Sequence, residues 1–441
     1  RDMRSIRGIG FKPDLVWLKP RDKTDFWIDY DSVRGPVSAL YGNGNNAEFV
    51  SSQNYQLKSF DEDGFSLGSW NNINGAGYRY VSYCWKAGGN DSTYNYNDVG
   101  YKDAGSLYSA TGVDLRTSTA GTTISGASIG TNTGLSIIRF AGTGSSLNLP
   151  HGLGKRPAWI LIKRISSAGN SWAVYHQYVG AQQQLLLNST NGVISDANGF
   201  DAVPDDTVVH LGSGAAMATN QSGTNIMWAW AEVDGFSRFG FYYGNNNSAD
   251  GPFAYCGFRP AMVWVKRADS NADHWCVWDT ARNPFNYNDL QLKFDDSAQD
   301  QDSSNGIHIT ATGFKVGANL TIDPSTGVLD ANPGSYTLPT ADATTLGGIK
   351  VGSGLSIDGN GVLTATGGST VPQIQDLSGT TSSLADDASA ELNITGYKAY
   401  SLFKITTDAE AWVRVYVDDA SRDADATRSE GEDPTPGSGV I

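Results

Sequence analysis

Residues 10–19 read Gly-Phe-Lys-Pro-Asp-Leu-Val-Trp-Leu-Lys, and this stretch returns at residues 257–266 as Gly-Phe-Arg-Pro-Ala-Met-Val-Trp-Val-Lys. A looser copy, Lys-Arg-Pro-Ala-Trp-Ile-Leu-Ile-Lys, occupies residues 155–163. In each copy a proline precedes aliphatic and aromatic residues, which strands favour, and a proline at a strand entrance loses no ladder hydrogen bond. Self-similarity of this kind predicts three tandem copies of one β-rich module.

The alignment of the copies extends beyond this first strand. Trp27, Trp172 and Trp275 each open an equivalent run of apolar residues. An aromatic-Asp-hydroxyl-X-Arg-X-Pro motif follows at residues 30–36 and 278–284, whereas the second copy has His176-Gln177-Tyr178-Val179 at this place. Short alternating strands joined by Gly/Asn turns predict an all-β fold of tandem β-sandwich modules of jelly-roll type.

A shorter repeat follows the third copy. Residues 313–323 recur 35 residues later at 348–358, and both segments are followed by Gly-Val-Leu. Units this short bury too little apolar surface to fold alone, so they indicate a fibre shaft wound from three copies of the chain, a homotrimer. A flexible linker between domains is the alternative.

These patterns predict a boundary wherever one repeat type gives way to the next. The predicted segments are sandwich repeat 1 (1–90), connecting strands (91–133), sandwich repeat 2 (134–234), a possibly truncated sandwich repeat 3 (235–318), the shaft-like linker (319–371) and a small C-terminal β module (372–441).

The bulk composition excludes several classes of partner. The chain has 441 residues and a net charge of −15, and its Lys and Arg are scattered, which argues against nucleic acid. No apolar run approaches the 18 residues that span a bilayer, so we expect no membrane insertion. Three unpaired cysteines among many loops favour folding in a reducing cytoplasm.

Polar loops supply the candidate binding residues. Asn and Gly tolerate turn conformations, so these loops are either simple turns or a hydrogen-bonding rim for glycans. The candidate rim residues are Asn43, Asn45, Asn46, Trp70, Asn245, Asn246 and Asn247.

No signature of catalysis or of a cofactor is visible in the sequence. The five histidines are far apart and lack the spacing of metal ligands. Clustered acidic residues in loops could at most hold calcium, and the weak candidates are Asp61, Asp63, Asp300 and Asp302. We therefore expect a protein that is not an enzyme.

The motifs quoted above resemble a repeated module of marine bacteriophage structural proteins, those of cyanobacterial myoviruses in particular. Residues 344–352, Thr-Thr-Leu-Gly-Gly-Ile-Lys-Val-Gly, resemble the shaft repeat of many phage tail fibres, and residues 411–441 resemble a terminal module of the same virion proteins. The resemblance implies a virion protein assembled in the host cytoplasm, in contact with other virion proteins.

The resemblance leaves three functions open. The first is a tail fibre or similar appendage that presents sandwich modules to host cell-surface polysaccharide. The second is a capsid-decorating or baseplate structural protein without a receptor role. The third is a tail-associated polysaccharide depolymerase, which would contradict the expectation that the chain is not an enzyme.

Overall fold

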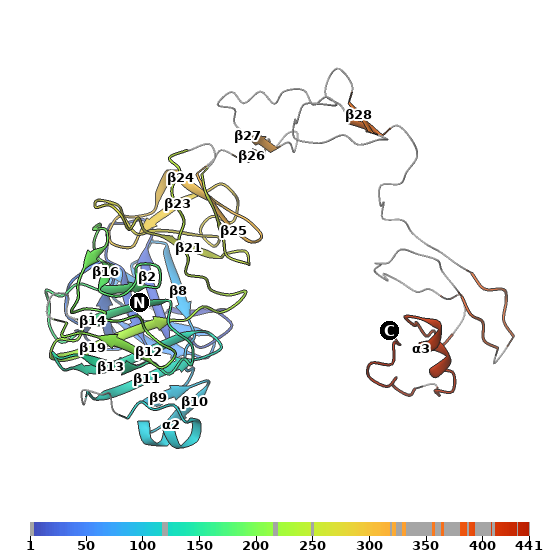
Figure 1. Ribbon diagram of the computed structural model, residues 1–441, viewed down its shortest axis with the longest axis horizontal. Coiled ribbons are helices and arrows are strands. Elements are labelled where there is room, and N and C mark those ends of the chain that lie inside the picture. The colour runs from blue at the N-terminus through green and yellow to red at the C-terminus, as the bar shows by residue number, and fades with distance from the viewer. Residues whose placement is uncertain are drawn as a thin grey trace. The chain divides into compact units, whose positions relative to one another are not determined.

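The computed structural model divides into two compact units, Arg1–Thr337 and Leu338–Ile441. Its ordered elements are almost all strands, which confirms the all-β prediction (Figure 1). The structure describes residues 4–116, 122–214, 219–247, 251–317, 320–322, 329–331, 355–357, 363–365, 380–385, 388–392, 407, 411–429 and 431–440.

Module 1 consists of two sheets packed face to face, as a sandwich requires. A five-stranded sheet has the order β5-β4-β3-β2-β8, and a three-stranded sheet has the order β1-β7-β6. Phe65 of the smaller sheet is buried against Val16 and Tyr30 of the larger one. The elements are β1 (Arg4–Arg7), β2 (Leu15–Pro20), β3 (Ile28–Asp31), β4 (Ser38–Tyr41), β5 (Phe49–Val50), β6 (Leu57–Asp61), β7 (Gly64–Leu67), α1 (Asn71–Asn74) and β8 (Tyr80–Trp85).

Module 2 is larger because the predicted connecting segment adds strands to its sheet. The nine-stranded order is β10-β9-β11-β12-β19-β14-β15-β16-β17, and β13 pairs separately with β18. Asp103 caps the helix α2, which contacts β9 and β10. The elements are β9 (Tyr94–Tyr96), β10 (Val99–Tyr101), α2 (Ala104–Thr111), β11 (Ile124–Gly130), β12 (Leu135–Gly142), β13 (Leu147–Pro150), β14 (Trp159–Arg164), β15 (Ala173–His176), β16 (Gln183–Leu186), β17 (Ile194–Ser195), β18 (Val208–Leu211) and β19 (Gly223–Trp230).

Module 3 forms one six-stranded sheet with the order β20-β25-β24-β23-β22-β21. Its strand β21 corresponds to β2 and β14, because all three follow the repeated proline stretch. The strands are β20 (Phe253–Tyr255), β21 (Met262–Val265), β22 (Cys276–Asp279), β23 (Asn288–Lys293), β24 (Gln301–Ile309) and β25 (Gly313–Val316).

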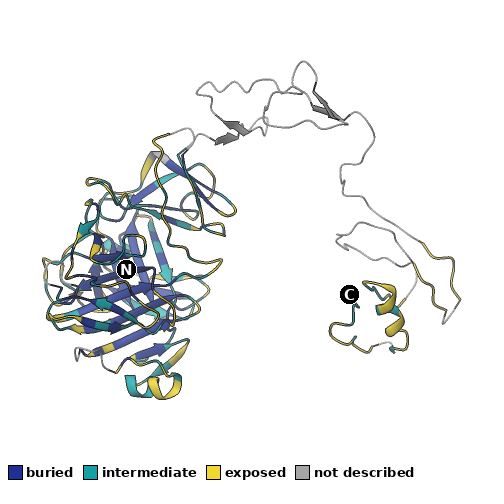
Figure 2. Cartoon of the chain, viewed as in Figure 1, coloured by how far each residue is buried: buried dark blue, intermediate teal, exposed yellow. Residues whose placement is uncertain are grey.

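The three modules pack around one shared hydrophobic core. Alternate residues of β2 point to opposite faces, so Leu15 and Trp17 belong to the shared core while Val16 and Leu18 belong to the core of module 1. Because both faces of these strands are buried, their apolar runs are continuous. The burial is visible as the dark blue strands of Figure 2.

Three equivalent tryptophans close the modules into a ring. The Nε1 of Trp27 in module 1 donates to the Lys293 carbonyl of module 3, at 2.9 Å. The Nε1 of Trp172 in module 2 donates to the Tyr41 carbonyl of module 1, at 3.0 Å.

The third hydrogen bond completes this ring. The Nε1 of Trp275 in module 3 donates to the Leu186 carbonyl of module 2, at 2.9 Å. Each donor lies at an equivalent junction between modules, and each acceptor ends an equivalent strand. The repeats therefore form a threefold-like assembly within a single chain.

Equivalent lysines lie at the ends of the strands β2 and β14. Lys19 and Lys163 are fully buried. Lys19 Nζ donates to the carbonyls of Pro20 and Ser297, and Lys163 Nζ donates to that of Asn170. Burial lowers the pKa of both ammonium groups to about 8.

We expect these two lysines to make stability depend on alkaline pH. Between about pH 8 and 10.5 the unfolded state keeps the lysine proton that the folded state has lost, so stability rises with pH. Relative to Lys163→Met, the wild-type free energy of unfolding should rise by about 2 kcal/mol between about pH 7.5 and 9.5, measured by urea titration.

Substitution of the exposed Lys155 with methionine is the matched control. This control should show no such difference, and an equal pH response of Lys163→Met and wild type would contradict the prediction.

The shorter repeat forms equivalent strand pairs. In the first unit β26 (Leu320–Ile322) pairs antiparallel with β27 (Leu329–Ala331), and in the second unit β28 (Leu355–Ile357) pairs with β29 (Leu363–Ala365). In the described part of the C-terminal module, α3 (Asp419–Ala424) accompanies an isolated bridge between Tyr416 and Val440.

Candidate functional site

The aromatic-Asp-hydroxyl-X-Arg motif forms a buried ion pair that joins two modules. In module 1, Arg34 Nε lies 2.6 Å from Asp31 Oδ2, and both side chains are fully buried. The same carboxylate accepts a hydrogen bond from Trp228 Nε1 of module 2, at 3.1 Å. The motif is thereby occupied with structural contacts.

The second copy of this motif makes the same contact at the next junction. Arg282 pairs with Asp279 in module 3, and Tyr83 of module 1 donates its hydroxyl proton to Asp279 Oδ2 at 2.7 Å. Burial raises the pKa of Tyr83 well above its ordinary value, so this phenol stays protonated as a donor. Tyr83 and Trp228 occupy equivalent positions on β8 and β19.

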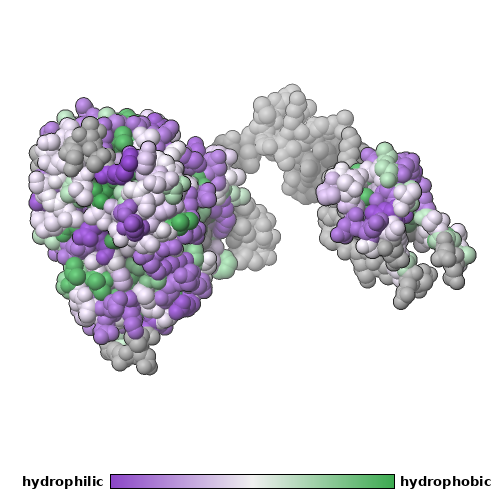
Figure 3. Space-filling model, turned by 90° about the horizontal axis from the view of Figure 1, so that it is seen from below, coloured by the Kyte–Doolittle hydropathy of each residue, from purple (hydrophilic) through white to green (hydrophobic). Residues whose placement is uncertain are grey.

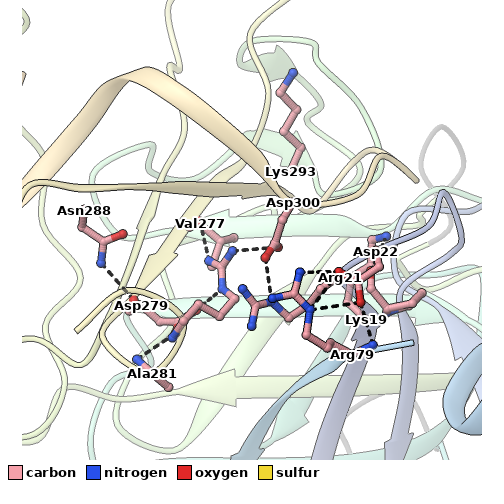
Figure 4. Close-up of polar contacts among 12 residues, drawn as sticks. Lys19, Arg21, Asp22, Arg79, Val277, Asp279, Ala281, Asn288, Lys293 and Asp300 are labelled. Atoms are coloured by element: carbon pink, nitrogen blue, oxygen red, sulfur yellow. Dashed lines mark hydrogen bonds and ion pairs between the residues drawn. The ribbon is translucent and has the colours of Figure 1, made fainter. Parts of the chain in front are cut away.

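Asp300 extends this polar junction between modules 1 and 3 (Figure 4). Its carboxylate lies 2.6 Å from Arg21 Nε and 3.1 Å from Arg282 Nη1. Asp300 is one of the predicted calcium candidates, and two guanidinium groups hold it here.

The calcium candidates of module 1 also have protein partners. Asp63 accepts hydrogen bonds from the backbone of Gly8 and Gly10, and Asp61 accepts from Ser59 and Ser66. Among the described residues no group of three or more His, Cys, Asp or Glu side chains could hold a metal ion.

The junction between modules 2 and 3 differs from the other two. His176 occupies the position of Asp31 and Asp279, and burial lowers the pKa of its imidazole to about 4. At neutral pH this ring is therefore uncharged. Its Nδ1 accepts a hydrogen bond from Tyr178 N at 3.3 Å.

An exposed aromatic patch lies beside this junction, and we define it by Tyr178, Phe241 and Tyr243. Their exposed fractions are 55%, 57% and 83%. The Tyr178 and Phe241 ring centroids are 4.6 Å apart, and those of Phe241 and Tyr243 are 5.5 Å apart. Contiguous exposed apolar surface of this kind is a mark of binding surfaces.

Elsewhere the visible surface offers no comparable feature. On the face shown in Figure 3, hydrophobic residues of the described part of the first unit stand as small separate spots within a hydrophilic surface. This distribution is ordinary for a globular surface.

The predicted glycan rim is divided between buried and exposed positions. Asn43 accepts a hydrogen bond from Trp27 N at 2.9 Å, and the equivalent Asn188 accepts from Trp172 N at 3.0 Å. Both amides therefore act as turn residues beside the tryptophan ring. Trp70 is buried in the core of module 1.

The other rim candidates are exposed and lie on two different connections. Asn45 and Asn46 belong to the loop after β4, where the Asn45 carbonyl accepts from Gly169 N. Residues 245–247 follow Tyr243 of the aromatic patch by two positions. The sequence reasoning missed the patch itself, although the alternation of aromatics at positions 239, 241 and 243 was a visible signal.

Comparisons with known proteins place the chain in a family. No curated protein and no solved structure matches it. Among the described residues, no helix is long and apolar enough to cross a bilayer.

One family, described as a domain of unknown function (DUF7483), matches residues 1–102 and 90–328. The match of one family to two ranges agrees with the internal repetition, and together the ranges cover residues 1–328 of 441. The chain therefore belongs to the DUF7483 family.

Proposed function

We propose that this chain is a structural protein of a bacteriophage virion, a tail fibre or similar appendage, whose modules attach to polysaccharide on the host surface. The observation that carries the proposal is the closed ring of three modules beside an exposed aromatic patch. Buried charged groups at two junctions serve contacts between modules, which suits a rigid scaffold that displays a surface.

The aromatic patch is the proposed contact with the polysaccharide. Aromatic rings offer large, rigid apolar area with a polar tip on each tyrosine, which suits the apolar faces and hydroxyl groups of sugar rings. Both Tyr178 and Tyr243 leave much of their side chains exposed. The exposed amides of residues 245–247 extend the same connection and supply further hydrogen-bonding groups.

The proposal includes assembly into a homotrimer through the shaft-like segment 319–371. Isolated two-stranded hairpins such as β26–β27 are marginally stable in water, so equivalent strands from further copies would stabilise them. Three linked copies would turn weak single contacts with sugar into firm attachment.

We expect the triple substitution Tyr178→Ala, Phe241→Ala and Tyr243→Ala to weaken binding to host envelope polysaccharide at least tenfold. The measurement is biolayer interferometry of the full chain on immobilised polysaccharide. The matched control replaces three other exposed aromatics, Phe26, Tyr255 and Phe285, and should bind within twofold of wild type. Equal binding by the two triple variants would remove the patch from the proposal.

Two further readouts on the same preparation separate the competing functions. Immunogold label against the chain should lie on fibres of intact virions, whereas label on the capsid or baseplate would favour a purely structural role. New reducing ends released from the polysaccharide would instead show a depolymerase. Sedimentation of the full chain should give a trimer.

A further inference from the structure

The strand β21 has a free edge where its two counterparts are paired. The strand β2 lies between β3 and β8, and β14 lies between β15 and β19. In contrast, β21 is the terminal strand of its sheet and pairs only with β22 among the described residues. Module 3 thus lacks, in its described part, the strand that corresponds to β8 and β19.

The burial of the three strands reflects this difference. Every residue of β2 is buried, and so are the first five residues of β14. On β21 only Val263 is buried, while Met262, Trp264 and Val265 remain partly exposed. An edge strand with apolar side chains and unpaired backbone groups is a template for another strand.

The contact that the absent strand would make is altered as well. At the two complete junctions, an aromatic side chain of β8 or β19 donates to Asp279 or Asp31 of the neighbouring module. At the third junction the acceptor position holds His176. The connection from β19 to β20 passes nearby and stacks Phe239 on Trp159 at 5.9 Å. The described part of that connection makes no backbone hydrogen bond to β21.

The two internal examples define the strand that would fit. Opposite the core residues of β2 lie Val81, Tyr83 and Trp85, and opposite those of β14 lie Ile226, Trp228 and Trp230. Both strands run antiparallel and share the pattern branched aliphatic-X-aromatic-X-Trp.

We propose that the free edge of β21 binds an extended segment of a separate polypeptide with this pattern. Thr280 N donates to the Ala261 carbonyl. The antiparallel ladder therefore directs the backbone groups of Met262 and Trp264 away from β22, to the free edge. The incoming strand pairs with these groups and lays its two aromatic side chains on the shared core.

The histidine selects the middle residue of this segment. Because His176 Nδ1 accepts from Tyr178 N, its ring proton lies on Nε2, which is then a donor. A tyrosine hydroxyl can accept from this group, whereas a tryptophan indole has only a donor. The segment that fits best therefore has tyrosine in the middle, as β8 does.

The test uses a fluorescent peptide with the sequence of residues 79–88, in which serine replaces Cys84. Binding to the full chain is measured by fluorescence anisotropy. We expect micromolar affinity, and at least tenfold weaker binding when the peptide carries an N-methyl group at the Tyr83 position. This control keeps every side chain and removes only an edge hydrogen bond. Replacing the same tyrosine with tryptophan should weaken binding severalfold.

A protein variant tests the same edge from the other side. Met262→Lys places a charge on the free edge and should weaken peptide binding at least tenfold. Phe253→Lys, on the opposite terminal strand β20, should bind within twofold of wild type. Thermal melting confirms that both variants fold, and the N-methyl comparison does not depend on them.

Three results would overturn the proposal. They are the absence of peptide binding to wild type, equal binding of the N-methylated peptide, or a dimer in sedimentation that Met262→Lys dissociates. The last result would show that a second copy of this chain covers the edge.

Discussion

Replacing Asp29 with valine should raise the free energy of unfolding by about 2–4 kcal/mol. Asp29 is fully buried on β3, and neither of its carboxylate oxygens has a hydrogen-bond partner. The equivalent residues of modules 2 and 3 are Val174 and Val277, which lie fully buried in the shared core. Valine is therefore the side chain that this position accommodates twice already.

Close packing around the carboxyl group explains the cost. A Cβ atom added at Gly42 would lie 2.6 Å from Asp29 Oδ2 and 2.6 Å from Phe294 Cζ, so carboxyl, glycine and ring meet closely. Burial raises the pKa of Asp29 well above its ordinary value, and the acid is held in its neutral form.

The raised pKa also sets how the gain depends on pH. Below about pH 4 the carboxyl is protonated in both states, so no proton is exchanged on folding. As the pH rises towards the folded-state pKa, the unfolded state ionises first and wild-type stability falls. The advantage of Asp29→Val should therefore be larger at pH 7 than at pH 4, measured by urea titration at each pH.

The neighbouring acid Asp31 supplies the control. Its carboxylate is paired with Arg34, so Asp31→Asn leaves a buried guanidinium without its partner and should cost about 3–5 kcal/mol. Opposite signs for the two substitutions are the expected pattern. A loss of stability in Asp29→Val would show that the carboxyl group has a partner that supports the fold.

The repeats and their strands could be predicted from sequence because they depend on local patterns. The prolines and tryptophans recur in register, and the motif around Asp31 and Arg34 marks equivalent turns in the first and third copies. The ring could not be predicted, since it depends on indole nitrogens such as that of Trp27 reaching carbonyls more than a hundred residues away. One local signal was available, because continuous apolar runs such as residues 15–18 indicate strands buried on both faces.

The candidate site was less predictable for a related reason. Asn43 and Trp70 belong to residue types common in glycan sites, but one completes a turn and the other fills a core. Exposure decides between these roles, and it depends on tertiary packing. Tyr178 is exposed where module 2 departs from the shared motif, so the departure itself was the useful signal.

Replacing Trp17 with alanine should destabilise all three modules together, by about 3–5 kcal/mol. The indole is fully buried and contacts every module. Its ring centroid lies 4.6 Å from Trp85 of module 1, 5.7 Å from Trp228 of module 2 and 5.1 Å from Trp264 of module 3. The cavity would therefore open at the centre of the ring.

Trp70→Ala is the matched control, because it removes the same side chain from the core of module 1 alone. Hydrogen exchange measured by mass spectrometry should show that Trp17→Ala accelerates exchange in β14 and β21 as much as in β2. Trp70→Ala should accelerate it most in β7 and β2. Faster exchange confined to module 1 in both variants would mean that the modules fold independently. Rigid display of a surface beside modules 2 and 3 requires the opposite, since the shared core is what fixes the orientation of that surface.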